Sequence, residues 1–198
     1  TQYYKYHPDS ESRHTFDGLS TQNLDSISSW SDGYSTSVNA DEQVIVYEKI
    51  TDRAGNVTYI NNQEGVIADN TSPTAPEIKI TAAEPAQGIY NASVPFTIDV
   101  TDPENGGTYA GLKEVSYEIT NNGKVTQSGN YNSDLSDPTA RVHNIHRSET
   151  VNAELNNSNH VTIKVKAVDY AGNQSEATKD LKIDITHPEV TITFDLNN

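Results

Sequence analysis

Side chains that carry oxygen atoms, the kind of ligand preferred by Ca²⁺, gather at one acidic loop and near the expected ends of modules. The sequence contains no EF-hand loop, so a calcium site built from these residues would be irregular. The alternative interpretation is that they are ordinary turn acids on a solvated surface. The candidate metal ligands are Asp69, Asp99, Asp102, Glu104, Asn105 and Asp184.

Aromatic side chains in the first part of the chain could serve a second kind of chemistry, the stacking of sugar rings. Tyr4, Tyr6, Trp30 and Tyr34 cluster in a region that is otherwise polar and irregular. Exposed aromatic rings offer flat, rigid faces for a ligand. These four residues are therefore the candidate ligand-binding residues. In the competing interpretation, Trp30 is a residue of the hydrophobic core of the first module.

No residue pattern predicts catalysis. His143 and His146 stand close together, but Arg141 and Arg147 flank them and would repel a divalent cation. No Ser-His-Asp arrangement can be assembled from the sequence, and no glycine-rich loop precedes a helix, because no helix is expected. We therefore expect a protein that is not an enzyme and that has no cofactor, with Ca²⁺ as the one candidate.

The composition argues against nucleic acid as a partner, against membrane insertion and against disulfides. The 198 residues carry 28 acidic and 13 basic side chains, which give a formal net charge of −15. Such a charge repels phosphate backbones and anionic lipids, so nucleic acid is not expected as a partner. No apolar run approaches the roughly 20 residues that span a membrane, so insertion is not expected either. The chain has no Cys, which excludes disulfides, and it has no Met and begins at Thr1, as expected for a piece of a longer protein.

Two motifs recur in the same order and define the domain organisation. Asp52-Arg53-Ala54-Gly55-Asn56 returns as Asp169-Tyr170-Ala171-Gly172-Asn173, and Pro76-Glu77-Ile78-Lys79-Ile80 returns as Pro188-Glu189-Val190-Thr191-Ile192. The spacing indicates modules of roughly 110 residues, the size of an immunoglobulin-like sandwich. We predict a truncated module at 1–70, a Pro-containing linker at 71–76, a complete module at 77–187 and the start of a third module at 188–198.

Alternation of apolar and polar side chains predicts an all-β fold: two Ig-like antiparallel β-sandwich modules in tandem, the first lacking its N-terminal strands. The stretch 127–150 is polar and is expected to be irregular. Gly and Asn in each Asp-x-Ala-Gly-Asn motif favour a tight turn, so each motif should join two antiparallel strands. Expected strands lie at 3–6, 44–50, 57–60, 77–81, 94–101, 113–120, 161–167 and 174–183.

Glu48 is the residue that fits this pattern least. When Asp52 is aligned with Asp169, Glu48 falls where the second module has Val165, on the face expected to be the core. Either the face is open because the first module is incomplete, or a carboxylate is buried there with a partner, since an unpaired buried charge is costly. A lone strand at 188–198 could pair with the incomplete module of a neighbouring copy, which predicts donor-strand self-association.

The stretch 46–60 and the junction Asp184-Ile185-Thr186-His187-Pro188 resemble the tandem bacterial Ig-like repeats of secreted and cell-wall-anchored surface proteins. The resemblance covers about half of the chain. It implies a β-sandwich fold, an extracellular location, neighbouring modules of the same chain as partners, and calcium at the joints between some modules. Glu48 departs from the family pattern, in which a small or apolar residue is expected.

In this family such modules are mostly stalks and spacers, and we therefore expect a structural module of a bacterial surface adhesin. Two alternatives remain open at the level of the sequence. One is a module that binds a glycan or a host protein through the aromatic first segment. The other is an accessory domain of a secreted glycan-degrading enzyme.

Overall fold

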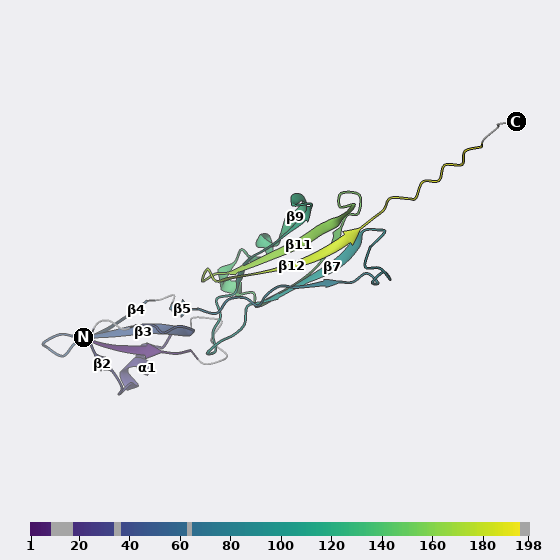
Figure 1. The fold of residues 1–198 in the computed structure, drawn as a ribbon. Helices are drawn as coiled ribbons and strands as arrows, with labels where there is room; N and C mark the ends of the chain where they lie inside the picture. Colours follow the sequence, from purple (N-terminus) through teal and green to yellow (C-terminus); the bar gives the residue numbers. More distant parts are fainter. Residues whose placement is uncertain (9–17, 34–36, 63–64, 195–198) are drawn as a thin grey trace.

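The computed structural model of the chain describes residues 1–8, 18–33, 37–62 and 65–194. Two bodies rich in β-strands lie end to end, and the segment after the last strand runs straight away from the second body (Figure 1). All strand pairs are antiparallel within the described sheets. The expected all-β class is confirmed.

The first module is built on one sheet, with strand order β2-β1-β3-β4 and β5 paired with the start of β3. Within the described residues, no second sheet faces it. The only α-helix of the described residues, α1, packs against it through the buried Leu24, beside Ile45 and Tyr47. The elements are β1 (Gln2–Tyr6), α1 (Thr21–Ser26), β2 (Ser31–Asp32), β3 (Glu42–Thr51), β4 (Val57–Asn61) and β5 (Val66–Ala68).

Helix α1 was not expected from the sequence. It is one and a half turns long, too short to show a helical repeat of apolar residues, and its start is fixed by capping. The side chain of Ser20 accepts a hydrogen bond from the backbone N–H of Asn23, and the Asn23 side chain accepts one from the N–H of Ser20. This reciprocal pair satisfies N–H groups that a helix start leaves free.

The second module is a sandwich of two sheets, β10-β7-β6 and β12-β11-β8-β9, whose facing apolar side chains form one core. Strand β11 shows the pattern best, because Val161, Ile163, Val165 and Ala167 are all fully buried. Its elements are β6 (Glu77–Ile80), β7 (Val94–Thr101), β8 (Leu112–Asn121), β9 (Lys124–Asn130), the 3₁₀ turns Asn132–Leu135 and Pro138–Ala140, β10 (Asn144–Val151), β11 (Ser158–Asp169) and β12 (Gln174–Ile183).

The expectation of an irregular stretch at 127–150 was wrong, because this stretch holds the end of β9 and all of β10 except its last residue. Strand β10 puts Ile145 and Val151 into the core, but two positions between them on the same face are polar. Glu149 is accommodated there by accepting hydrogen bonds from the hydroxyls of Tyr117, at 3.0 Å, and Tyr131, at 2.8 Å. The two inward polar residues, Arg147 and Glu149, interrupt the alternation of apolar and polar side chains on which the sequence prediction depended.

Both Asp-x-Ala-Gly-Asn motifs form the predicted turns between antiparallel strands, β3–β4 and β11–β12. In the first, Asp52 Oδ1 accepts hydrogen bonds from the backbone N–H groups of Ala54, at 2.8 Å, and Asn56, at 2.9 Å. Gly55 has a φ of 92° and Gly172 a φ of 96°, a conformation that glycine adopts without strain. The same local chemistry therefore builds the same turn in both modules.

Candidate metal centre at the joint between the modules

Three aspartates meet where the two modules touch. One carboxylate oxygen from each of Asp69, Asp102 and Asp169 lies within 4.8 Å of the others, and all three residues are buried. Asp69 follows β5 in the first module, Asp102 follows β7, and Asp169 ends β11. The cluster therefore combines the exit of one module with two loops of the next.

The backbone around two of these aspartates holds their carboxylates in place. Asp169 Oδ1 accepts from the N–H of Asn173 at 2.8 Å, and Oδ2 accepts from the side-chain amide of the same residue at 2.9 Å. Asp69 Oδ1 accepts from the N–H of Thr71 at 2.9 Å, and Oδ2 from the N–H of Ala110, in the second module, at 2.7 Å. The repeated turn motif thus also orients a candidate ligand.

Asp102 is only half satisfied. Its Oδ2 accepts from the N–H of Gly111 at 2.7 Å, whereas its buried Oδ1 has no hydrogen-bond partner in the part of the chain that the structure describes. A buried carboxylate oxygen without a partner costs free energy, and native proteins seldom leave one. The like charges of Asp69 and Asp169 act on Asp102, so a positive partner suits this oxygen best.

The pKa values of the cluster also indicate that positive charge is missing there. Burial raises the pKa of Asp102 from its usual value near 3.8 to about 7, and the charges of Asp69 and Asp169 add to the effect. The Gly111 N–H and the Arg141 guanidinium oppose it. Burial likewise raises the pKa of Asp169, and the charge of Asp69 adds to that rise. Without a cation, the cluster therefore holds protons more tightly than ordinary carboxyl groups do.

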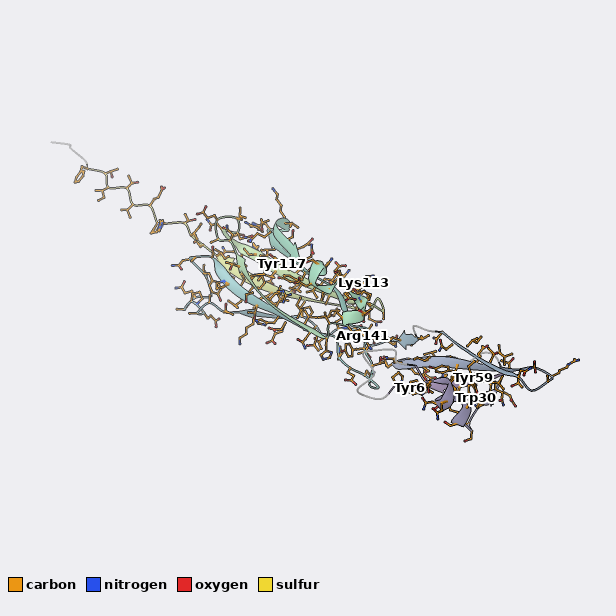
Figure 2. All side chains as sticks on the ribbon, turned by 180° about the vertical axis from the view of Figure 1, so that it is seen from behind. Tyr6, Trp30, Tyr59, Lys113, Tyr117 and Arg141 are labelled. Carbon is orange, nitrogen blue, oxygen red and sulfur yellow. The ribbon has the colours of Figure 1, made fainter. Side chains whose placement is uncertain are left out.

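Arg141 is the cation that the structure provides, and it lies at the joint (Figure 2). Its buried guanidinium donates from Nη1 to Gln43 Oε1 at 3.0 Å and from Nη2 to the carbonyl of Tyr109, and it stacks over the Tyr109 ring at 4.8 Å. When all three carboxylates are ionised, one guanidinium leaves two negative charges at the centre. A divalent cation balances that charge.

The donor set fits Ca²⁺, which prefers oxygen ligands and tolerates irregular geometry. The residues that would hold it are Asp69, Asp102 and Asp169. No histidine or cysteine belongs to the cluster, so a softer metal such as zinc is less well matched.

The structure brings together two of the six residues offered as metal ligands from the sequence, Asp69 and Asp102. Asp184 directly follows β12, and this strand ends on the side of the second module remote from the first (Figure 1). There its Oδ1 accepts from the N–H of Thr186 at 2.9 Å, in the same turn that Asp69 makes with Thr71. Asp99 is on the surface, with Oδ1 2.5 Å from His146 Nδ1.

The last two candidates, Glu104 and Asn105, lie near the joint but outside the cluster. Asn105 donates from Nδ2 to Asp41 Oδ2 at 2.9 Å and to Thr71 Oγ1 at 3.0 Å, so it ties the modules together. Glu104 is exposed and acts on the buried Arg141 through its charge. Asp169 was not among the six, although its place in the second turn motif was a signal that could have identified it.

The described aromatic candidates pack against one buried cluster of the first module, in which Figure 2 labels Tyr6, Trp30 and Tyr59. The half-buried Trp30 is stacked on Tyr59 with 5.6 Å between ring centroids, and it meets Tyr4 at 5.9 Å. Tyr6 packs against the cluster of Leu24, Ile45 and Tyr47. Tyr34 lies outside the described residues. The described rings therefore form part of a small core, in which Lys49 Nζ lies 5.6 Å from the Trp30 ring.

Comparison with known proteins agrees with the fold. A family model described as a bacterial Ig-like domain matches residues 19–70 and 87–185, which is more than half of the chain. A search of curated proteins gives no significant match. Among the described helices, none is long and apolar enough to cross a membrane. The chain therefore belongs to the bacterial Ig-like domain family, a family of structural and interaction modules.

Proposed function

We propose that the chain is a stiff stalk segment of an extracellular bacterial surface adhesin, and that its joint is locked by Ca²⁺. The observation that carries the proposal is the buried Asp69–Asp102–Asp169 cluster, which spans the two modules and contains an unpaired carboxylate oxygen. A spacer must resist bending where its modules meet. A metal centre at that place serves this function directly.

The linker supports stiffness before any cation binds. Pro73 and Pro76 are buried, and the N–H of Thr74 donates to the carbonyl of Thr101, at the end of β7, at 2.7 Å. Asn173 in the second turn motif donates from Nδ2 to the carbonyl of Asp69 at 3.1 Å. The linker therefore lies on the second module as part of its structure, whereas a free linker would let the modules swing.

Because of Arg141 and the three aspartates, the rigidity of the joint depends on Ca²⁺ in the surrounding solution. A bound Ca²⁺ would neutralise the excess negative charge and supply the partner that Asp102 Oδ1 lacks. Asp69 belongs to the first module, so ordering its carboxylate also holds that module in a fixed orientation. Without the cation, repulsion among the carboxylates weakens the contact that Asp69 makes with the N–H of Ala110.

Thermal unfolding with Ca²⁺ and with a chelator tests the metal centre. We expect millimolar Ca²⁺ to raise the midpoint of the wild-type chain, because a ligand at about 100 times its Kd stabilises the folded state by about 2.7 kcal/mol. Asp169→Asn should lose the response. The matched control is Asp52→Asn, which changes the same residue of the same turn motif at an exposed place and should keep it.

Small-angle X-ray scattering of the same samples tests the stalk. The wild-type chain should have a narrow distribution of lengths in Ca²⁺ and a broader, more bent one in chelator. An unchanged midpoint together with an unchanged scattering profile would reject the calcium lock. A wide spread of lengths in both conditions would reject the stiff stalk itself.

A further inference from the structure

The loop between β7 and β8 reaches across the joint through the side-chain amide of Asn105. This amide donates from Nδ2 to Asp41 Oδ2 at 2.9 Å and to Thr71 Oγ1 at 3.0 Å. Asp41 precedes β3 of the first module, and its Oδ1 accepts from the N–H of Asn70 at 2.9 Å and from Thr71 Oγ1 at 3.2 Å. The Asn105 amide therefore belongs to a network that joins the first module, the linker and the second module.

The packing of the joint requires a glycine directly after Asn105. Asn105 and Thr108 exchange two backbone hydrogen bonds of 2.9 Å around a turn. Its central residues, Gly106 and Gly107, have φ values of 58° and 85°, and a positive φ at both positions favours glycine. At Gly106 space also excludes a side chain, because an added Cβ would lie 2.8 Å from the backbone oxygen of Asp41. The joint thus selects the dipeptide Asn105-Gly106.

An Asn-Gly dipeptide leaves the asparagine side chain open to attack by its own backbone. The nitrogen of the following residue can bond to the side-chain Cγ, and glycine has no Cβ to hinder the approach. Here Asn105 and Gly106 are exposed, and in the described part of the chain the N–H of Gly106 makes no hydrogen bond. The nucleophile is free and water has access to the amide. The hydrogen bonds to Asp41 and Thr71 are what restrain the reaction.

We propose that Asn105 is a self-modifying residue, which deamidates when the joint opens and then keeps the joint from closing as before. The Gly106 nitrogen loses its proton to a base in solution and bonds to Cγ of Asn105. The bond from Cγ to Nδ2 breaks, and this nitrogen takes up a proton and leaves as ammonia. Water then opens the cyclic imide to aspartate or isoaspartate. The net reaction consumes one water and releases one ammonia.

Neither product can replace asparagine in the network. A carboxylate at position 105 donates no hydrogen bond, and it would face the carboxylate of Asp41, which the amide now meets at 2.9 Å. Two like charges at such a distance repel each other. Isoaspartate also lengthens the main chain, so the turn no longer places Gly106 against the backbone of Asp41. Modification therefore converts a reversible opening of the joint into a lasting one.

A second Asn-Gly dipeptide, Asn122-Gly123, provides an internal reference. It is exposed in the turn between β8 and β9, and a Cβ added at Gly123 would meet nothing within 4 Å. The Asn122 amide donates to Asn121 Oδ1 at 2.9 Å and to Ser158 Oγ at 3.1 Å, both within the second module. Opening of the joint leaves these contacts as they are. Asn122 should therefore deamidate at a rate that does not depend on the joint.

Peptide mass mapping of the full chain, sampled over time in one mildly alkaline buffer, measures both sites at once. Asp41→Gly removes the carboxylate that holds the Asn105 amide, and glycine suits the φ of 55° at that position. We expect this variant to deamidate at Asn105 at least roughly threefold faster than the wild-type chain, because a hydrogen bond to a charged group no longer restrains the amide. The rate at Asn122 should be equal in both chains.

Two results of this experiment would overturn the proposal. One is an Asn105 rate that Asp41→Gly leaves unchanged, which would mean that the joint does not restrain the reaction. The other is a wild-type chain that shows no reaction at Asn105 even when it is unfolded in urea, where the amide has lost its partners. A faster reaction at Asn105 in urea than in the folded chain would support the proposal.

The variant Asn105→Asp carries the aspartate product from the start and tests its effect on the joint. Thermal unfolding in chelator should give it a lower midpoint than the wild-type chain. The matched control is Asn122→Asp, the same exchange before a glycine but remote from the joint, which should keep the wild-type midpoint. Equal midpoints for the two variants would overturn the lasting effect on the joint. None of these measurements requires Ca²⁺, so they are independent of the proposed calcium lock.

Discussion

Arg141 donates a hydrogen bond from Nη1 to Gln43 Oε1 at 3.0 Å across the joint between the modules, although the two residues are 98 positions apart in the chain. Both side chains are buried. A guanidinium with such partners is not a surface ion pair that water screens. The joint is therefore built like the interior of a domain, with a charged group whose removal leaves other polar groups unsatisfied.

Arg141→Ala should lower the stability of the chain by about 2 kcal/mol, since a buried hydrogen bond to a charged group contributes about that much. It should also uncouple the modules, because Gln43 and the Tyr109 carbonyl lose their shared donor. Differential scanning calorimetry should then resolve two transitions in place of one. Arg53→Ala, at an exposed turn position, is the matched control. An unchanged thermogram would contradict a role for Arg141 in the joint.

Asp102→Asn should stabilise the chain in chelator at neutral pH. The asparagine oxygen can still accept from the Gly111 N–H, but the buried negative charge is gone. The same change should remove most of the stabilisation by Ca²⁺. Asp99→Asn, on the strand that precedes Asp102 but with a side chain at the surface, should alter neither quantity. Urea denaturation with and without Ca²⁺ measures both, and a fully retained calcium response in Asp102→Asn would exclude Asp102 as a ligand.

The stability of the metal-free chain should fall as the pH rises from about 5 to about 7. The pKa of Asp102 is raised to about 7 in the folded state, so in this range the folded chain binds more protons than the unfolded chain. Asp102 alone then lowers the stability by at most about 1.4 kcal/mol per pH unit, and its effect levels off above pH 7. The raised pKa of Asp169 acts in the same direction. Asp52 and Glu42, whose pKa values are lowered, act only at lower pH.

Urea denaturation at several pH values in chelator measures this slope. Added Ca²⁺ should reverse it, because cation binding competes with protonation of the carboxylates. In Asp102→Asn the slope between pH 5 and 7 should be much smaller. A wild-type chain that gains stability over this range in chelator would show that Asp102 is not desolvated as the structure has it.

Trp30→Ala should destabilise the first module by about 2 kcal/mol, less than the loss of a fully buried tryptophan, because the ring is only half-buried against Tyr4 and Tyr59. Trp30→Phe should recover much of this loss. A glycan array of the wild-type chain addresses the alternative function, and for a stalk we expect no signal. A signal that disappears in a folded Trp30→Ala variant would make the aromatic segment a binding site.

Local signals in the sequence were enough to predict the repeated parts of the fold. Gly55 and Gly172 mark turns that need a positive φ, and the strands around them alternate in the usual way. Strand β10 was missed because its inward Glu149 depends on two tyrosine hydroxyls that come from β8 and from the turn after β9. Helix α1 was missed because its capping pair, Ser20 and Asn23, also occurs in ordinary turns.

The candidate site, like the fold, could be predicted from the sequence only in part. Asp69 and Asp102 could be proposed because oxygen ligands tend to gather near module ends, and Asp169 could have been added from its turn motif. Nothing in the order of residues shows that Asp102 loses its contact with water, or that Arg141 turns toward Gln43 in the other module. Those facts depend on how two modules dock, which is a property of surfaces that the one-dimensional pattern does not describe.

Gly111 offers the sharpest test of how closely the joint is packed. Its φ is 88°, and a Cβ added there would lie 2.8 Å from Arg141 Cα and 3.0 Å from Arg141 C. Gly172 has a similar φ of 96°, but a Cβ added there meets nothing within 4 Å. Gly172→Ala should therefore cost only the backbone strain, about 1 kcal/mol. Gly111→Ala should cost clearly more, since the backbone of Arg141 must move and its guanidinium leaves Gln43. Equal losses in urea denaturation would mean that the loop holding Arg141 is free to shift, and the rigid joint would then depend on the cation alone.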